Sequence, residues 1–452
     1  MSSHYDLHTL ATYAAQIEIG DLPADVLSVA KACLLYGLAV GTGARRAAVC
    51  RLAIAANSGH GDENGATRLF DGRCVDPGEA VFANAVMMSA RVQGDAHACG
   101  HVGGMVIPAA LATAEYTHAS GARLLAAIVA GYEVALRIGR DHAADLSIRG
   151  LRTSPCYGVF GAAAAAARTR GLTSTQMTSA LALAANCAGG LREFVDAGTE
   201  ESPFQSGFAA RNGMHVSNLA AVDVVAAPSS LHGKAGFFNA YGNGGADYGA
   251  RLVTQLGEQH EFTNVTFREY PANQFFRGII RGMATLGQQA GHVEPRSIKL
   301  HMHPFEANFI GARYAGPYTS ATQTVVSAPF CAALAWVTGT ATFDALRRFD
   351  DDRVLRLIPR VELIAEVSCA RYEPRVEVEL ANGETLSWAE DAGAGSYRLT
   401  WDAATRMTYQ LFDEVDVPKS LAQRLIEQAG AVDKLVDVMP LTSAVCAATL
   451  SS

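Results

Sequence analysis

The sequence predicts a mainly α-helical protein with a second, smaller α+β domain. Of the 452 residues, 49% are hydrophobic. Apolar residues recur at helical spacing over about the first 260 positions, and period-two alternation follows further along the chain. Because this length exceeds what one hydrophobic core normally supports, two domains are expected. We predict a helical domain over 1–265, an α+β domain over 266–395, and C-terminal helices over 396–452 that return to the helical domain.

The first domain carries several helical patterns. Thr173 and Gln176 have the spacing of a capping box, directly before one apolar run. Because the patterns are apolar on nearly all sides, we expect the helices to pack inside a large bundle. The clearest patterns lie at 25–40, 107–116, 124–138 and 177–185.

The second domain begins where the pattern changes, near Tyr270-Pro271. Apolar residues there alternate with polar or acidic ones, which is typical of a half-buried strand. The last alternating segment ends in Asn382-Gly383, a strong signal for a β-hairpin. A helical segment over 322–337 separates the strands, and the chain turns helical again at 421–435. The predicted strands are 297–302, 361–367 and 376–380.

Composition and charge exclude several classes of protein. A net charge of −8 without a basic stripe argues against a nucleic-acid partner. Nine cysteines without a Cys-x-x-Cys pair predict neither a disulfide framework nor a zinc ribbon. The first residues lack the features of a signal peptide, and polar residues interrupt the longest uncharged stretches, near 172–191 and 325–343. We therefore expect a soluble, cytoplasmic protein with no membrane partner.

The segment 91–108 is the candidate site. It places Arg91, Asp95, His97 and His101 within eleven residues, between two apolar helices. Its glycines break regular structure, so we predict a loop or a helix entrance. Polar residues on a loop that rigid helices hold are suited to a functional site. A solvated loop between helices is the alternative, and the spacing alone does not separate the two interpretations.

The sequence gives little support for a site that binds a metal or a nucleotide cofactor. His97 and His101 have the His-x-x-x-His spacing of a zinc site, with Asp95 as a further ligand. However, the glycines weaken a helix here, and no glutamate follows His97 as a general base. The chain has no glycine-rich dinucleotide motif after a strand, no P-loop motif and no Gly-x-Ser-x-Gly elbow. We predict a reaction that needs no metal and no other cofactor.

Several sequence landmarks together resemble a known family. The resemblance spans roughly residues 10–450, and the landmarks keep their order. The family is MmgE/PrpD, whose members include 2-methylcitrate dehydratase, cis-aconitate decarboxylase and iminodisuccinate epimerase. The resemblance implies a large helical domain, a smaller α+β domain and a homodimer. The landmarks are 80–85, His101-Val-Gly-Gly with Pro108-Ala-Ala-Leu-Ala, 131–134, 158–166, 207–213, 236–242 and Tyr270-Pro271.

Four arginines stand at positions where the resemblance implies other catalytic residues. Arg91 replaces an aspartate, Arg152 a histidine and Arg268 a lysine, and Arg277 falls near another histidine. The chain has 31 arginines and 5 lysines, so codon composition explains most of them. Arginine stays ionised and binds carboxylates through paired hydrogen bonds. Because four arginines around one ligand would repel each other unless the ligand were polyanionic, we expect these four to bind a polycarboxylate.

The chemistry that the resemblance implies is removal of a proton from a carbon next to a carboxylate. Our first expectation is a cofactor-independent epimerase of an iminodisuccinate-like polycarboxylate, in which reprotonation on the other face inverts the centre. His101 matches the family histidine and would be the first base or acid, because imidazole titrates near neutral pH. His97, Asp95 or Tyr157 would serve the opposite face.

Two functions other than an epimerase are also consistent with these residues. A lyase acting on a citrate- or aconitate-like tricarboxylate would use His101 as the base, and Asp95 or Tyr157 would protonate the leaving hydroxyl. A catalytically silent homologue would only bind a polycarboxylate. The loss of the family aspartate, at Arg91, and of the family lysines, at Ser202 and Arg268, keeps this second alternative open.

Overall fold

The computed structural model describes residues 3–56, 61–243 and 247–451. Met1 and Ser2, on which part of the signal-peptide expectation rests, lie outside the described residues. The chain divides into two compact units. Segment Glu193–Glu200, which we expected in the helical domain, groups with the second unit. The first unit comprises Met1–Arg192, Glu201–Thr266 and Leu399–Ser452, and the second comprises Glu193–Glu200 and Phe267–Arg398.

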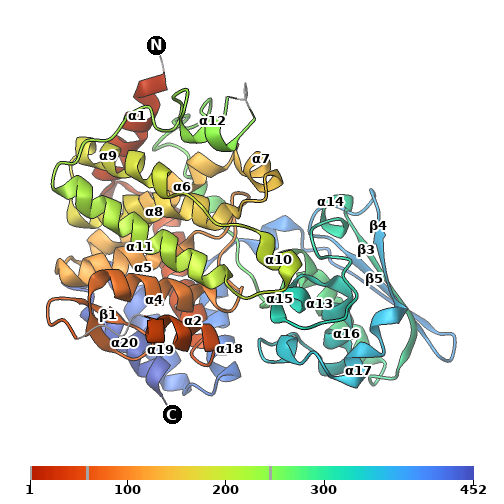
Figure 1. Ribbon diagram of the computed structural model, residues 1–452. Helices are drawn as coiled ribbons and strands as arrows, with labels where there is room; N and C mark the ends of the chain where they lie inside the picture. Colours follow the sequence, from red (N-terminus) through yellow and green to blue (C-terminus); the bar gives the residue numbers. More distant parts are fainter. Residues whose placement is uncertain (1–2, 57–60, 244–246, 452) are drawn as a thin grey trace. The chain divides into compact units, whose positions relative to one another are not determined.

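The first unit is a bundle of helices, as the apolar patterns predicted (Figure 1). The helices are α1 (Ser3–Gln16), α2 (Ala24–Gly43), α3 (Ala48–Ala56), α4 (Pro77–Ser89), α5 (Gly103–Tyr116), α6 (Gly121–Gly139), α7 (Ala143–Ile148), α8 (Thr153–Arg170), α9 (Ser174–Ala184), α11 (Ser202–Ala221), α12 (Phe237–Tyr241), α18 (Trp401–Glu414), α19 (Lys419–Gly430) and α20 (Met439–Leu450). A small antiparallel sheet of β1 (Ala66–Arg68) and β2 (Arg73–Val75) lies against two of them, α4 and α5.

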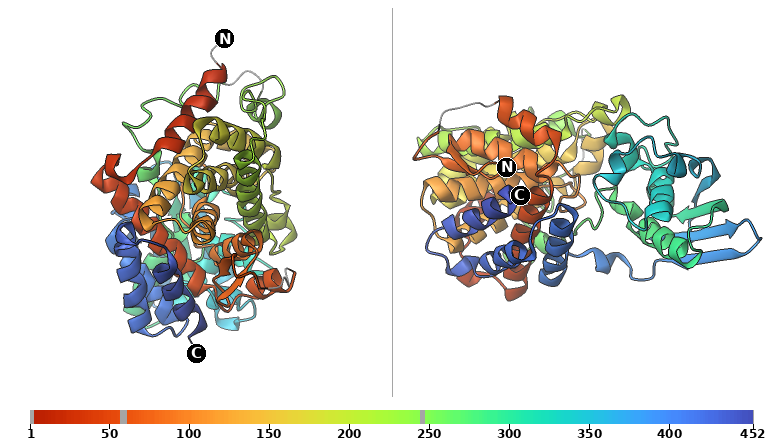
Figure 2. Two further views of the ribbon diagram at one scale, coloured as in Figure 1. Left: turned by 90° about the vertical axis from the view of Figure 1, so that its left-hand side faces the viewer. Right: turned by 90° about the horizontal axis from the view of Figure 1, so that it is seen from below.

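Helix α8 lies at the centre of this bundle, in contact with α5, α6, α9 and α11 (Figures 1 and 2). Its residues are buried along almost the whole helix, and six alanines and two glycines are among its 18 residues. Small side chains let neighbouring helices approach closely. A Cβ atom on Gly131 of α6 would lie 2.7 Å from the carbonyl oxygen of Gly161 in α8. The alanine-rich sequence of α8 therefore sets the spacing of the bundle that carries the candidate site.

Replacing Gly131 by alanine is expected to lower the free energy of unfolding by about 1–3 kcal/mol, the usual cost of overpacking a core. The added methyl group would meet backbone on α8, which cannot move aside as a flexible side chain can. Gly189→Ala is the control, because nothing lies within 4 Å of a Cβ atom there. Chemical denaturation of both variants tests the difference. Equal stabilities would show that the α6–α8 contact is not tight.

The sequence also predicted how single helices begin. The Thr173 side chain accepts a hydrogen bond from the Gln176 backbone, and the Gln176 side chain caps Thr173 in return, which confirms the capping box of α9. Helix α2 is the one described helix that is long and apolar enough to cross a membrane, by length and composition. However, 72% of its apolar window is buried inside the protein, as in the core helix of a soluble protein.

The second unit contains a four-stranded sheet and short helices, which confirms an α+β region in this part of the chain. The strand order is β4-β3-β5-β6, with β3 and β4 parallel and the other pairs antiparallel. The strands are β3 (Pro295–Met302), β4 (Val361–Ala365), β5 (Arg375–Leu380) and β6 (Thr385–Ala389), and the helices are α10 (Glu193–Ala197), α13 (Arg277–Gln289), α14 (Pro304–Ala307), α15 (Ala321–Val326), α16 (Ala328–Thr338) and α17 (Asp352–Leu355).

Two of the predictions for this unit can be compared with its backbone. Strands β5 and β6 form the hairpin that Asn382-Gly383 indicated, and Gly383 has a φ of +85° at the turn. The single helix expected over 322–337 is divided into α15 and α16. The division falls at Ser327, which is extended and precedes a new helix with Pro329 in its first turn. Helices α13 and α16 pack on the sheet and bury its apolar face (Figure 1).

Candidate functional site

The candidate loop connects α4 to α5 in the first unit, and its glycines give it a tight course. Reciprocal backbone hydrogen bonds of 2.9 and 3.0 Å join His97 and Gly100. Gly100 has a φ of +134°, which residues with side chains rarely adopt. A Cβ atom there would lie 3.0 Å from the backbone nitrogen of Ser154, in the first turn of α8. The loop is therefore pressed against the N-terminus of α8.

His101 ends this loop with its ring orientation defined. Its Nδ1 atom lies 2.7 Å from the backbone carbonyl oxygen of Asp95, and its backbone N–H donates to the Ser154 hydroxyl at 3.0 Å. A carbonyl oxygen only accepts hydrogen bonds, so Nδ1 must carry a proton. In the neutral ring, Nε2 is then the basic nitrogen. This arrangement suits a residue that takes up or delivers a proton through Nε2.

Asp95 is buried at the start of α5. Its Oδ1 atom accepts the Gly103 backbone N–H at 3.0 Å, at the positive end of the helix. A Cβ atom on Gly103 would lie 2.5 Å from Oδ1, so only glycine fits there. Burial, followed by the charge of Asp95, raises the pKa of Tyr132 well above its ordinary value. Asp95 thus stabilises the first turn of α5, a structural role that the sequence did not indicate.

His97 contacts Glu261 through its side chain. Its Nε2 atom lies 3.0 Å from Glu261 Oε1, and its side chain is 5% exposed. Burial is the largest influence and disfavours the charged ring, but Cys99 and Glu261 together outweigh it and raise the pKa of His97 to about 10. Its other ring nitrogen, Nδ1, lies 3.3 Å from the backbone nitrogen of Cys99, so both ring nitrogens contact the protein. These contacts favour a holding role for His97, and its predicted role as an acid or base stays a prediction.

Tyr157 lies in the core of the first unit with 0% exposure. Its hydroxyl is hydrogen-bonded to His142 Nδ1 at 2.9 Å, and His142 is surrounded by the rings of Phe237, Phe238 and Tyr248. Burial raises the pKa of Tyr157. Because a fully buried phenol cannot reach a substrate, we do not retain Tyr157 as a catalytic residue.

The buried ring of His142 predicts a loss of stability in acid. Burial lowers the pKa of His142 to about 4, from an ordinary value of 6.5. As the pH falls from 6.5 toward 4, the unfolded chain takes up a proton at this residue and the folded protein does not. The folded state is therefore destabilised in this window, by up to about 3 kcal/mol.

Chemical denaturation of the wild type and of His142→Phe between pH 4 and pH 8 tests this expectation. The substitution removes the hydrogen bond to Tyr157 at every pH, so it adds a constant difference. What should change is the slope, which is expected to be smaller in the variant below pH 6.5. Parallel curves across the whole range would contradict the assignment.

Arg91 is fully buried in the first unit. Its Nε atom donates to Gln93 at 3.1 Å, Nη1 to the carbonyl oxygen of Gly43 at 2.9 Å, and Nη2 to Glu414 at 2.6 Å. Each nitrogen of the guanidinium group thus already has an acceptor in the protein. This corrects the predicted role in binding substrate, because a carboxylate ligand would have to displace these partners.

Arg152 fits its predicted role better than Arg91 does. It is half-buried at the start of α8, three positions after Arg149. It lies two positions before Ser154, whose hydroxyl accepts a hydrogen bond from the His101 backbone. Its Nη1 atom donates to the carbonyl oxygen of Ser202 at 2.7 Å. The structure thus brings Arg152 to Ser202, a position where the resemblance implies a lysine. Arg152 remains a proposed ligand for a carboxylate.

Arg268 and Arg277 belong to the second unit and line one small hollow there, of about 10 Å³. A space of this size suits one water molecule. Arg277 is buried, donates to the Ser396 carbonyl at 3.0 Å, pairs with Glu269 at 3.0 Å, and stacks 4.0 Å from the centre of the Tyr397 ring. These contacts give Arg277 a structural role, and Arg268 remains a proposed ligand.

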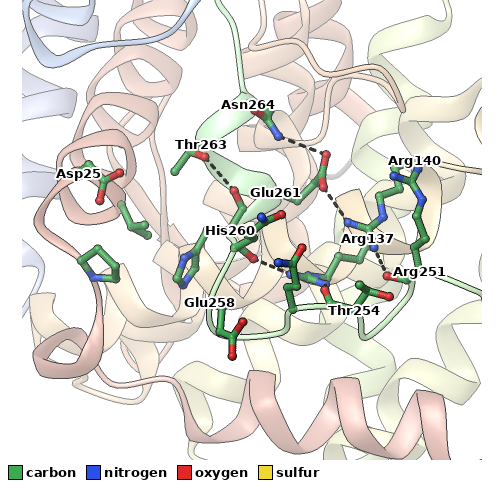
Figure 3. A pocket seen from close by; sticks show the side chains of 14 residues that line it. Asp25, Arg137, Arg140, Arg251, Thr254, Glu258, His260, Glu261, Thr263 and Asn264 are labelled. Atoms are coloured by element: carbon green, nitrogen blue, oxygen red, sulfur yellow. Dashed lines mark hydrogen bonds and ion pairs between the residues drawn. The ribbon is translucent and has the colours of Figure 1, made fainter.

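A larger open cavity, of about 500 Å³, lies in the first unit and contains residues that the sequence did not indicate (Figure 3). Glu261 lines it between Asn264 and Arg140. The lining arginines are already paired: Arg137 with Glu133, Arg140 with Glu261 and Arg251 with Asp141. The cavity therefore has no excess of positive charge, and we assign it no ligand.

Metal ligation was the other hypothesis for the loop. Within residues 3–56, 61–243 and 247–451, no group of three His, Cys, Asp or Glu side chains is placed to hold a metal ion. His97 faces Glu261, and His101 Nδ1 faces a carbonyl oxygen, so the two imidazoles are directed to different partners.

Comparison with known proteins identifies a family and several relatives that are similar to the chain. The MmgE/PrpD N-terminal domain matches residues 8–248. The chain is 30% identical over 271 residues to a cis-aconitate decarboxylase-like protein, oryM, of Aspergillus oryzae, which covers 57% of this chain and 56% of that protein. It is also 30% identical over 209 residues to human cis-aconitate decarboxylase, covering 44% and 42% of the two chains.

A cis-aconitate decarboxylase of Aspergillus terreus is similar to the same degree, with 30% identity over 211 residues, or 45% of this chain and 43% of the relative. The chain thus matches about half the length of these curated relatives. The family match itself covers more than half of the chain and includes the loop, His101 and the first turn of α8. The chain belongs to the MmgE/PrpD family.

Proposed function

We propose that the chain is a cofactor-independent lyase that acts on a small polycarboxylate, with His101 transferring a proton at a carbon atom. The geometry of His101 carries this proposal. The hydrogen bond from Nδ1 to the Asp95 carbonyl sets the tautomer, so that Nε2 is the basic nitrogen of the neutral ring. The decarboxylase names of the relatives support lyase chemistry more than epimerisation.

Such a reaction needs groups that stabilise negative charge. In a decarboxylation, the C–CO2 bond breaks, its electron pair shifts into the neighbouring conjugated system, and an acid delivers a proton to carbon. In a dehydration, a base removes the proton and hydroxide leaves. The positive end of α8, against which Gly100 and His101 lie, favours negative charge nearby. Arg152 in the same turn would bind a substrate carboxylate.

The structure also reduces the support that the four arginines give to a polyanionic substrate. Of the four arginines that suggested a polyanion, Arg91 and Arg277 are occupied by protein partners. Arg152 of the first unit and Arg268 of the second unit each stay a separate proposal, and a tetracarboxylate is no longer required. An iminodisuccinate-like substrate is therefore less strongly favoured than the sequence suggested.

An epimerase remains the second candidate, and one observation favours it. Arg152 and Ser202 lie together where the resemblance implies a histidine and a lysine. Without these two groups, a decarboxylase or dehydratase has fewer acids to complete its reaction. Epimerisation needs only removal and return of one proton. We include in the proposal that the enzyme works in the cytoplasm as a homodimer.

A panel of substrates with purified protein separates these possibilities. Cis-aconitate, citrate and iminodisuccinate are incubated in D2O and followed by NMR, ultraviolet absorbance and release of CO2. Loss of CO2 identifies a decarboxylase, and a new conjugated double bond identifies a dehydratase. Deuterium at an α-carbon without loss of any group identifies an epimerase and replaces the lyase proposal. If binding occurs but no substrate reacts or exchanges, the chain is a silent polycarboxylate-binding homologue.

A further inference from the structure

The loop that carries His101 is attached to a distant part of the first unit, the segment 261–266. Ala96 and Thr266 exchange two backbone hydrogen bonds, of 2.9 and 2.8 Å. The neighbouring residue, His97, contacts Glu261 in the same segment. The loop therefore has a backbone attachment and a side-chain attachment next to each other.

The side-chain attachment is a buried ion pair that uses both oxygens of Glu261. Oε1 accepts from His97 Nε2 at 3.0 Å, and Asn264 lies 3.4 Å from the same oxygen. Oε2 accepts from Arg140 Nη1 at 2.8 Å. The side chains of Glu261, His97 and Arg140 are 17%, 5% and 11% exposed. Removing the carboxylate would leave two positive charges with little solvent around them, which is strongly unfavourable.

The charges of this pair are stable at neutral pH. The hydrogen bond from His97 is the largest of the influences that lower the pKa of Glu261 to about 2, and Arg140 adds to it. His97, with Cys99 beside its ring, keeps its proton well above neutrality. The other charged groups close to this cluster are Asp141, which lies 3.7 Å from Arg140, and Arg251, which pairs with Asp141 and interacts with the charge of Glu261. An ion pair that does not titrate near pH 7 is suited to holding a loop in place.

We propose that Glu261 is a positioning residue for the reaction, because it holds His97 and thereby fixes the loop that presents His101. This inference rests on the proposed function of His101. The two histidines lie four positions apart, and backbone hydrogen bonds join His97 to Gly100, the residue directly before His101. A shift of the loop at His97 therefore moves the Asp95 carbonyl and the ring of His101. Small misplacements of a reacting group have large effects on rate.

Glu261→Gln is the main test, because glutamine keeps the shape and an acceptor oxygen but removes the charge. It is expected to lower kcat by about 10- to 100-fold, with a smaller change in KM. Glu258→Gln is the matched control: Glu258 lies three residues earlier, is exposed and lines the same cavity. It loses the same charge without touching His97, so its kcat should equal that of the wild type.

The pH profile distinguishes positioning from a general loss of structure. Without the carboxylate, His97 loses much of what keeps it protonated, so its pKa should fall toward the neutral range. The kcat of Glu261→Gln should then change with pH around that pKa, whereas a general loss of structure would lower kcat by the same factor at every pH. His97→Gln should show the same loss of kcat as Glu261→Gln, and the double variant should lose little more.

Two measurements do not depend on turnover, so they separate this inference from the proposed function. Histidine NMR should show one ring with a high pKa in the wild type and in Glu258→Gln, and its loss in Glu261→Gln. Amide exchange of Ala96, His97 and Gly100 should be faster in Glu261→Gln alone. If these changes occur but no substrate reacts, the proposed function fails and the holding role stands. Unchanged NMR, exchange and kcat in Glu261→Gln would overturn the inference.

Discussion

Replacing His101 by alanine is expected to lower turnover by about 10²- to 10⁴-fold, the usual contribution of a positioned acid or base. The effect should fall on kcat more than on KM, because the imidazole transfers a proton and does not supply the charge that binds a carboxylate. Two hydrogen bonds give the reason: the one from Nδ1 to the Asp95 carbonyl holds the ring in one tautomer, and the one from the backbone N–H to Ser154 fixes the backbone that carries it.

His215→Ala is the matched control for this prediction. His215 is exposed on α11, and its removal should leave both kinetic constants and the unfolding transition unchanged. The kinetics are measured on the substrate that reacts in the panel, with the far-ultraviolet circular dichroism of each variant as a check of folding. A His101→Ala enzyme that folds and keeps more than a tenth of the wild-type kcat would show that another residue moves the proton.

Local patterns in the sequence were enough to predict much of the fold. The Thr173–Gln176 capping box and the Asn382-Gly383 hairpin each depend on residues within a few positions of one another, so they can be recognised without knowledge of the tertiary structure. The helix division at Ser327 was missed although Pro329 is a local signal. The apolar residues continue through it, and an apolar pattern alone does not show where one helix stops and the next begins.

The candidate site was predictable only in part, for a related reason. His101 and Asp95 lie in one short segment, so their association follows from the chain itself. Glu261 lies 164 residues from His97, and Glu414 lies 323 residues from Arg91. No local sequence pattern predicts partners that lie so far apart in the chain. Arginine, moreover, binds a substrate carboxylate and a glutamate side chain in the same way, so residue type alone could not show that Arg91 is occupied.

The second large effect is expected at Arg91. Arg91→Met should lower the free energy of unfolding by about 3–5 kcal/mol, because it removes one member of a buried ion pair. Arg91 is 0% exposed and Glu414 is 20% exposed. The substitution would leave the carboxylate without its partner, and it would also remove donors from the Gly43 carbonyl and the Gln93 side chain. Chemical denaturation measures the loss.

A double variant shows whether the loss comes from the ion pair. Arg91→Met with Glu414→Leu removes both charges and should be more stable than Arg91→Met alone, since no unpaired carboxylate remains. Arg46→Met is the control for an exposed pair: Arg46 is 51% exposed, its partner Asp416 is 78% exposed, and the expected cost is below about 1 kcal/mol.

Kinetics then decide between the structural role and the role that the sequence first suggested. If Arg91 only holds the bundle together, folded Arg91→Met should retain the KM of the wild type at a temperature well below its unfolding transition. If Arg91 binds a substrate carboxylate, KM should rise by at least tenfold while the stability changes little, because that charge-assisted contact would be lost. Burial, and the three acceptors around its guanidinium group, favour the first outcome.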